Sequence, residues 1–89
     1  MKSGTGVHEI LDETVVLFPN PAGSFVTITG LNFYKISVID VRGKVVSERL
    51  FEEIIDNYTY PLDGIPNGIY MLRLETSEGV KTRKLVIQR

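Results

Sequence analysis

Short runs of β-branched and aromatic residues, separated by glycine, proline, asparagine and aspartate, are the feature that most constrains the fold of this chain. Such runs favour strands, and the residues between them favour turns. Residues 24–29 show the pattern clearly, because Val26 and Ile28 alternate with residues on the opposite face. No segment of useful length has the period of a helix. The chain is therefore predicted to be all-β.

Seven strands at nearly regular spacing are expected, at residues 14–18, 24–29, 34–41, 45–51, 58–62, 69–76 and 80–87. Residues 30–32 are expected to be a connection, and residues 52–57 a loop between sheets. Pro61 places its strand at a sheet edge or ends it, because proline cannot donate to a ladder. This spacing predicts a seven-stranded antiparallel immunoglobulin-like β-sandwich, with a closed small barrel as the alternative.

The chain of 89 residues is long enough for one core but not for two. Residues 1–13 are expected to be a linker or tag-like lead, since they open with a run rich in serine, glycine and threonine. Residues 14–89 would form the domain. No apolar run approaches the roughly 20 residues that span a bilayer, and the start lacks the apolar stretch of a secretory signal. The chain is then either a cytoplasmic protein or, as the lead favours, the end of a longer exported one.

Catalytic and cofactor chemistry has no candidate in this sequence. His8 is the only histidine and cysteine is absent, so a zinc site or a Ser-His-Asp triad is not expected. The glycines lack a phosphate-binding spacing followed by a helix. The formal net charge of −1 and the few aromatic residues argue against nucleic-acid binding. We therefore expect no enzyme, no metal and no cofactor.

Several turns have strong backbone requirements. In the hairpin turn 40–44, Gly43 is expected to supply a positive φ and Asp40 to accept hydrogen bonds from turn amides. Asn67 would open the last hairpin with a second turn. Tyr70 is more often a core aromatic with its hydroxyl at the rim than a binding residue.

Four segments, taken in order, resemble the C-terminal sorting domain of cargo for the type IX (Por) secretion system of Bacteroidetes. They are Phe18-Pro19-Asn20-Pro21, then residues 40–45, 62–70 and 79–86. They stand in the order and spacing of that family, and the resemblance covers about residues 14–89. Two positions depart from the family pattern. Ile39 stands where many members have an aromatic residue, and Gly23 stands where the family often has a charged residue.

The resemblance implies a secretion signal that folds in the periplasm and directs attached N-terminal cargo through the outer-membrane translocon to the cell surface or beyond. A sortase-type protease would then remove the domain by cutting before Thr14. The chain would be the substrate of that reaction. The residues expected to be recognised by translocon or sortase are Pro19, Asn20, Pro21, Gly68, Tyr70, Gly79, Lys81, Arg83, Lys84 and Arg89.

The physical basis of recognition is expected to be the last hairpin, residues 68–89. An open strand edge can pair with a partner strand, and Lys81, Arg83, Lys84 and Arg89 would add a basic stripe for an acidic partner. Core residues are expected among Ile69, Leu72, Leu74, Leu85 and Ile87. A carbohydrate-binding or adhesive spacer module is the alternative function. The Pro-Asn-Pro turn could also act as the hinge of a strand-swapped homodimer.

Overall fold

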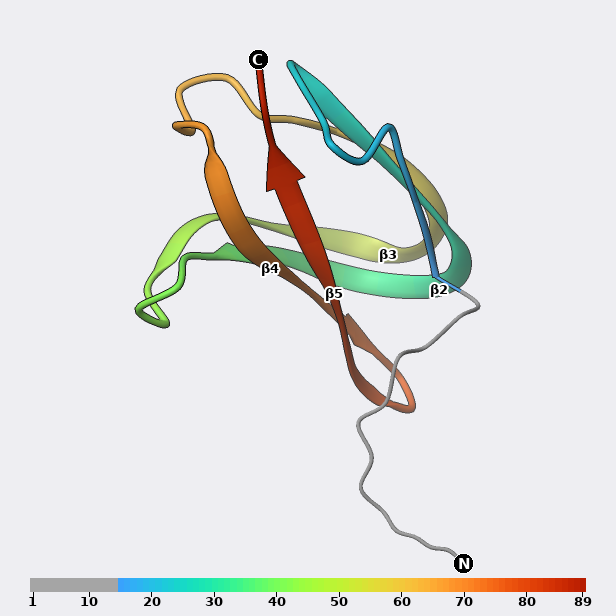
Figure 1. Ribbon diagram of the computed structural model, residues 1–89. Coiled ribbons are helices and arrows are strands. Elements are labelled where there is room, and N and C mark those ends of the chain that lie inside the picture. Colours follow the sequence, from blue (N-terminus) through green and yellow to red (C-terminus); the bar gives the residue numbers. More distant parts are fainter. Residues whose placement is uncertain (1–14) are drawn as a thin grey trace, which may run out of the picture.

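The computed structural model describes residues 15–89, and this part of the chain contains five strands and no helix (Figure 1). The strands are β1 (Val16–Phe18), β2 (Phe25–Ile39), β3 (Val45–Pro61), β4 (Gly68–Thr76) and β5 (Gly79–Ile87). All four strand pairings are antiparallel. The prediction of an all-β antiparallel chain is confirmed.

The long strand β2 organises the sheet, because it pairs with three other strands. The sheet runs in the order β1-β2-β4-β5, and β3 pairs with β2 outside that path. The first half of β2 lies between β1 and the end of β3, whereas its second half lies between β4 and the start of β3. The two halves of β2 therefore belong to two differently composed parts of the sheet.

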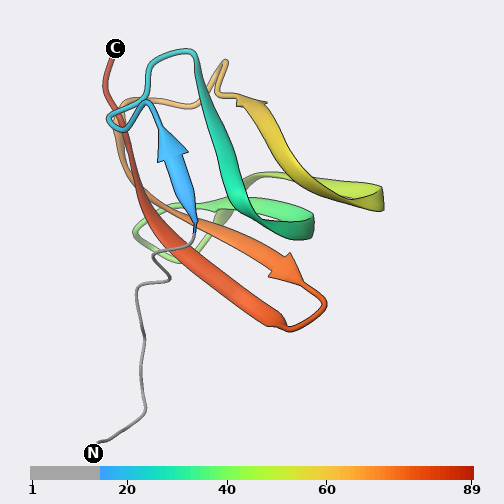
Figure 2. The ribbon, with the colours of Figure 1, turned by 90° about the vertical axis from the view of Figure 1, so that its right-hand side faces the viewer.

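The β2–β3 ribbon bends sharply between these two parts (Figure 2). The register shifts between Thr29 and Phe33 and again between Phe33 and Lys35. Gly30 has a φ of +111°, a conformation that side-chain-bearing residues rarely adopt. Bulges of this kind bend a strand and increase its twist, so the β2–β3 pair turns from one part of the sheet into the other.

The number of strands differs from the expected seven because residues 30–32 lie inside β2 and residues 52–57 lie inside β3. These residues look like loops because they are polar or contain glycine. The polar residues are accommodated because β3 lies at a sheet edge, where most of residues 52–57 are exposed. Pro61 ends β3, as predicted.

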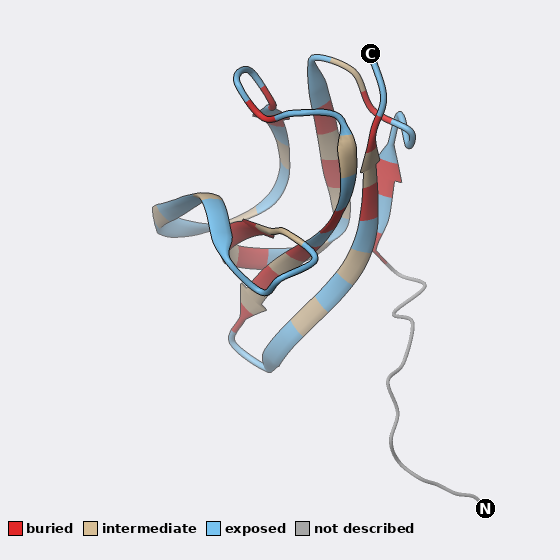
Figure 3. Cartoon of the chain, turned by 60° about the vertical axis from the view of Figure 1, so that its left-hand side comes forward, coloured by how far each residue is buried: buried red, intermediate tan, exposed pale blue. Residues whose placement is uncertain are grey.

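A single core joins the inner faces of both parts of the sheet. Buried bands alternate with exposed ones along the strands (Figure 3). The core consists of Val15, Leu17, Ala22, Val26, Ile28, Phe33, Ile36, Val38, Tyr60, Leu62, Ile65, Tyr70, Leu72, Leu74, Leu85 and Ile87. Ile69, which was grouped with core residues of the last hairpin, is instead 52% exposed. It alternates with Tyr70 and so points to the outer face.

Candidate recognition surface

The last hairpin does not carry its basic residues on one face. In the β4–β5 ladder, Lys81 lies opposite the buried Leu74, whereas Lys84 lies opposite the exposed Met71. Arg83, two residues from Lys81, shares the inner face with it. The expected basic stripe is therefore divided between the two faces of the sheet, and Lys84 is the member that lies exposed on the outer face.

Two arginines of the expected stripe hold the fold together. The guanidinium of Arg83 donates a hydrogen bond to the carbonyl of Val15. The guanidinium of Arg89 donates to the carbonyls of Leu62 at 2.5 Å and Ile65 at 2.7 Å. Hydrogen bonds with a charged partner are stronger than neutral ones. Arg83 therefore holds the start of the domain against β5, and Arg89 holds the chain end against the loop before β4.

Asn20 in the Pro-Asn-Pro turn binds the edge of β5 through its side chain. Its Nδ2 donates to the carbonyl of Lys84, and its Oδ1 accepts the amide of Val86, both at 3.1 Å. The carboxamide thus pairs with β5 as the backbone of a neighbouring strand would. Asn20 was predicted to be a recognition residue, but its bonds to Lys84 and Val86, more than 60 residues away, were not predicted.

Ala22 continues the same pairing and was not predicted. Its amide donates to the carbonyl of Val86, and its carbonyl accepts the amide of Gln88, each at 2.8 Å. Ala22 is fully buried and forms a parallel bridge with Ile87. The turn therefore closes the outer edge of β5 over residues 84–88.

The beginning of β5 keeps an open edge. Backbone groups alternate between the two edges of a strand, so the outward amides and carbonyls after Gly79 belong to Val80, Thr82, Lys84 and Val86. No residue in the described part of the chain bonds the backbone groups of Val80 or Thr82 on this side. Both residues are exposed. Within residues 15–89, the outward backbone groups that stay open are thus those of Val80 and Thr82.

The loop before β4 is held by its own side chains and by the chain end. The hydroxyl of Tyr70 donates to the carbonyl of Pro66 at 2.7 Å, and a side chain at Gly68 would begin 3.5 Å from the Tyr70 ring. Asn67 Oδ1 accepts the backbone amide of Arg89 at 3.1 Å. These residues of the motif give the loop its shape, while any part they take in recognition stays a prediction.

The two hairpin turns are stabilised by side chains, and the turn at residues 40–44 was predicted. The carboxylate of Asp40 accepts the amides of Lys44 and Arg42, each at 2.9 Å. The bond from Lys44 is the main cause that lowers the pKa of Asp40 below its ordinary value. Gly43 has the expected positive φ, +89°. In the turn between β4 and β5, Thr76 Oγ1 donates to the carbonyl of Gly79 at 2.8 Å.

The described surface contains hollows, and two of them matter for their position. The first, of about 330 Å³, is bordered by the turn 40–44, the start of β4 and Lys84, and its lining residues are Asp40, Val41, Gly43, Ile69, Tyr70, Met71 and Lys84. It lies beside the last hairpin. Exposed aliphatic side chains at Val41 and Ile69 give it an apolar wall.

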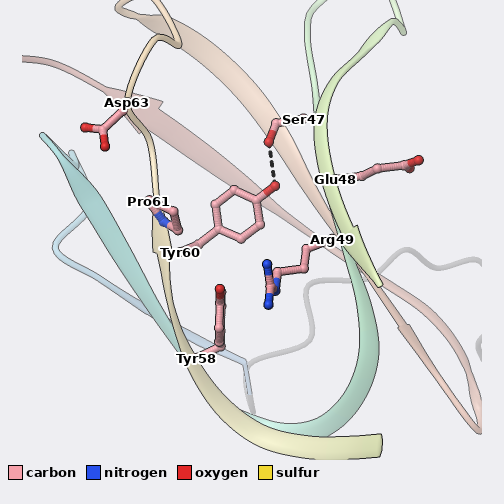
Figure 4. A pocket seen from close by; sticks show the side chains of 7 residues that line it. All are labelled: Ser47, Glu48, Arg49, Tyr58, Tyr60, Pro61 and Asp63. Atoms are coloured by element: carbon pink, nitrogen blue, oxygen red, sulfur yellow. Dashed lines mark hydrogen bonds between the residues drawn. The ribbon is translucent and has the colours of Figure 1, made fainter. Parts of the chain in front are cut away.

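The second hollow, of about 300 Å³, lies where the two halves of β3 approach each other (Figure 4). The hydroxyls of Ser47 and Tyr60 hydrogen-bond across it at 2.5 Å, and burial raises the pKa of Tyr60. The guanidinium of Arg49 lies 5.6 Å from the Tyr58 ring centre. The residues around this hollow were not predicted to lie together, because only the bend of β3 brings them close.

The described residues also lack two kinds of feature. No three histidine, cysteine, aspartate or glutamate side chains of residues 15–89 are placed to hold a metal ion. The same part of the chain has no helix long and apolar enough to cross a membrane. His8 and the expected cleavage region before Thr14 lie outside the described residues.

Comparison with known proteins identifies the family. A family model described as a secretion system C-terminal sorting domain matches residues 16–88, nearly all of the described chain. A search of curated proteins gave no match. The match covers the turn that closes β5, the hairpin turn 40–44 and the whole last hairpin. The chain belongs to the family of secretion system C-terminal sorting domains and is a C-terminal secretion signal of the type IX system.

Proposed function

We propose that the type IX translocon recognises the folded domain by adding a strand to the open edge of β5. The observation that supports the proposal is the edge itself. Asn20 and Ala22 close it over residues 84–88, whereas no described residue bonds the outward backbone groups of Val80 and Thr82. An added strand gains affinity from main-chain hydrogen bonds. The short open segment limits where such a strand can bind.

The fold around this edge supports recognition of the domain as a folded unit. We infer that the bent β2 and β3 each contribute to both layers of an immunoglobulin-like sandwich. Leu85 and Ile87, which follow the open edge, are buried in the core. Deleting residues 84–89 would therefore remove core side chains as well as the chain end, so loss of export after that deletion would not separate recognition from folding.

A proline at Thr82 tests the proposal without that difficulty. The amide of Thr82 faces away from β4, so Thr82→Pro removes an outward donor and leaves the ladder with β4 intact. We expect a cargo fusion with Thr82→Pro to melt near the wild-type temperature and to remain in the periplasm. Ser77→Pro, in the exposed turn of the same hairpin, serves as the control and is expected to be exported. Normal export of a folded Thr82→Pro fusion would refute strand addition at this edge.

Cleavage of the domain and release of the cargo are further parts of the proposed function. A sortase-type protease would cut before Thr14 and release the cargo at the cell surface. Mass spectrometry of the cargo recovered from the surface would locate the new C-terminus. A cut within residues 15–89 would contradict this part of the proposal, since that region forms the folded domain.

A strand-swapped homodimer would require the Pro-Asn-Pro turn to open. In the monomer this turn is bonded to β5 through Asn20 and Ala22, so exchange of β1 between two copies must break or re-form those bonds. Sedimentation across a wide concentration range tests the idea. A single monomeric species at every concentration would reject it.

Carbohydrate binding is the second candidate function, and one surface favours it. Phe18 and Phe25 are each about half exposed, at 49% and 47%. They lie near Thr27 and Thr59, whose hydroxyls hydrogen-bond at 3.0 Å across β2 and β3. Exposed rings beside hydroxyls suit stacking against a sugar. Saturable glycan binding that is lost in Phe18→Ala would support this function, whereas its absence would remove it.

A further inference from the structure

The outer face of the sheet formed by β3, β2, β4 and β5 has an ionic half and an apolar half. In the half near the β4–β5 turn, Lys35 lies 3.6 Å from Glu48 and 3.9 Å from Glu75. Arg73 also lies 3.9 Å from Glu75. These ion pairs join three strands. The charges of this half are thus matched within the domain itself.

The apolar half is a row of register neighbours that ends at a lysine. Val45 lies opposite Ile39, Ile39 opposite Met71, and Met71 opposite Lys84. Val45 and Met71 are each 41% exposed, and Ile69 beside them is 52% exposed. Directly opposite residues on one face of a sheet lie within side-chain contact of each other. The row therefore presents apolar side chains across three strands, β3, β2 and β4, and a cation on the fourth, β5.

The hollow of about 330 Å³ lies at the end of this row that holds Met71 and Lys84. Ile69, Met71 and Lys84 line it from the sheet, and Val41, which is 81% exposed, lines it from the turn 40–44. Exposed apolar side chains mark an interaction site when they adjoin one another, as Val41, Ile69 and Met71 do around this hollow. The volume is within the range of pockets that hold small groups.

Cations outnumber acids around the hollow when the bordering turn is included. Lys84 lines the hollow, and Arg42 and Lys44 lie in the turn 40–44 that borders it. Among the described residues that line it, Asp40 is the only acid, and its carboxylate already accepts the amides of Arg42 and Lys44. An incoming carboxylate would therefore find Lys84 as the cation in the lining.

We propose that this hollow binds a segment of the translocon in which a large apolar side chain lies next to an aspartate or glutamate. The apolar side chain covers Ile69 and Met71, and the carboxylate pairs with Lys84. Charge complementarity selects this occupant over a basic segment, since Lys84 is the cation of the lining and the carboxylate of Asp40 is already engaged with turn amides. The inference rests on the proposed function, because it names the chemistry of the partner that reads the last hairpin.

Substitutions on the exposed side chains test the hollow in cargo fusions expressed in a cell with the type IX system. We expect Ile69→Ser and Lys84→Glu each to lower the exported fraction several-fold while the melting temperature stays near that of the wild type. Lys84→Arg is expected to restore export. Leu50→Ser is the matched control, because Leu50 is 69% exposed on the same outer face but lies in the ionic half. Unchanged export in Ile69→Ser and Lys84→Glu would overturn the inference.

A photocrosslinker identifies the occupant. With benzoylphenylalanine in place of Met71, we expect an adduct whose partner peptide contains an apolar residue beside an acidic one and comes from an outer-membrane component of the system. An adduct to lipid, to a second copy of this chain or to a basic peptide would overturn the inference. So would a yield no greater than that from the same probe in place of Leu50.

These outcomes separate the inference from the proposed function. If the wild-type fusion is exported and Thr82→Pro blocks export, but Ile69→Ser and Lys84→Glu do not, then edge recognition stands and the hollow is not a site. If a folded Thr82→Pro fusion is exported as the wild type is, whereas Ile69→Ser and Lys84→Glu are retained, then strand addition at the edge fails and the hollow remains a site.

Discussion

Replacing Asn20 by alanine removes both side-chain hydrogen bonds that close the edge of β5. Nδ2 no longer donates to the carbonyl of Lys84, and Oδ1 no longer accepts the amide of Val86. A hydrogen bond contributes about 0.5–1.5 kcal/mol net to stability. Asn20 is exposed, so water can reach the freed groups, and the lower part of that range applies. We expect a loss of about 1–2 kcal/mol in the free energy of unfolding for the two bonds together.

Urea unfolding of the isolated domain measures this loss. The midpoint is expected to fall at an unchanged slope, because the variant buries the same core. In a domain of this size, about 1–2 kcal/mol corresponds to a drop of roughly 5–15 °C in melting temperature. Hydrogen exchange of the Val86 amide should also become faster. The amide of Leu85, which alternation directs toward β4, should be affected less.

Asn32→Ala is the matched control. Asn32 is also an exposed asparagine, but its side chain makes no bond to β5. We expect this variant to remain within about 0.5 kcal/mol of the wild type, as is usual for surface substitutions. If Asn20→Ala and Asn32→Ala had the same small effect, the carboxamide of Asn20 would not hold β5, and the account of the closed edge would be wrong.

Three further substitutions test other parts of the structure. Arg89→Ala removes the guanidinium from two carbonyls of the loop 62–67 and should cost about 1–3 kcal/mol in urea unfolding; a loss no larger than that of Gln88→Ala would contradict it. Leu72→Ala, at a fully buried position, should cost about 2–5 kcal/mol by the same measurement, and a smaller loss would mean that the core is not closely packed there. The pKa of Asp40 is lowered in the folded state, so its carboxylate stabilises the fold above the ordinary pKa and this contribution is lost as pH falls through the lowered one. Asp40→Asn should therefore be less stable than the wild type at neutral pH, with the difference shrinking in acid; a difference independent of pH would refute this.

Local sequence patterns predicted the features that depend on neighbouring residues. The turn at residues 40–44 follows from the hydrogen-bonding capacity of Asp40 and the positive φ of Gly43. Pro61 ends β3 because proline cannot donate to a ladder. Alternation could also have separated Lys84 from Lys81, since their spacing of three residues puts them on opposite faces of a strand.

Features that depend on distant residues could not be predicted in this way. Polar residues 52–57 resemble a loop, and only their pairing with the bulged part of β2 makes them a strand. The carboxamide of Asn20 could bond many groups, and nothing local indicates Lys84 or Val86. The hollow beside Ile69 also depends on two segments, the turn 40–44 and β4, that meet only in the folded sheet.

The bonds between the first turn and the last strand make the signal depend on an intact chain. The bonds of Asn20 join residues 64 and 66 positions apart, and contacts at such separations are slow to form during folding. Leu85 and Ile87 complete the core from the same strand. A polypeptide cut short before Leu85 would lack part of its core, and one cut short before Gly79 would also lack the whole of β5 with its edge. We therefore expect only cargo with a complete sorting domain to be exported. Prematurely terminated cargo would be retained without a separate proofreading factor.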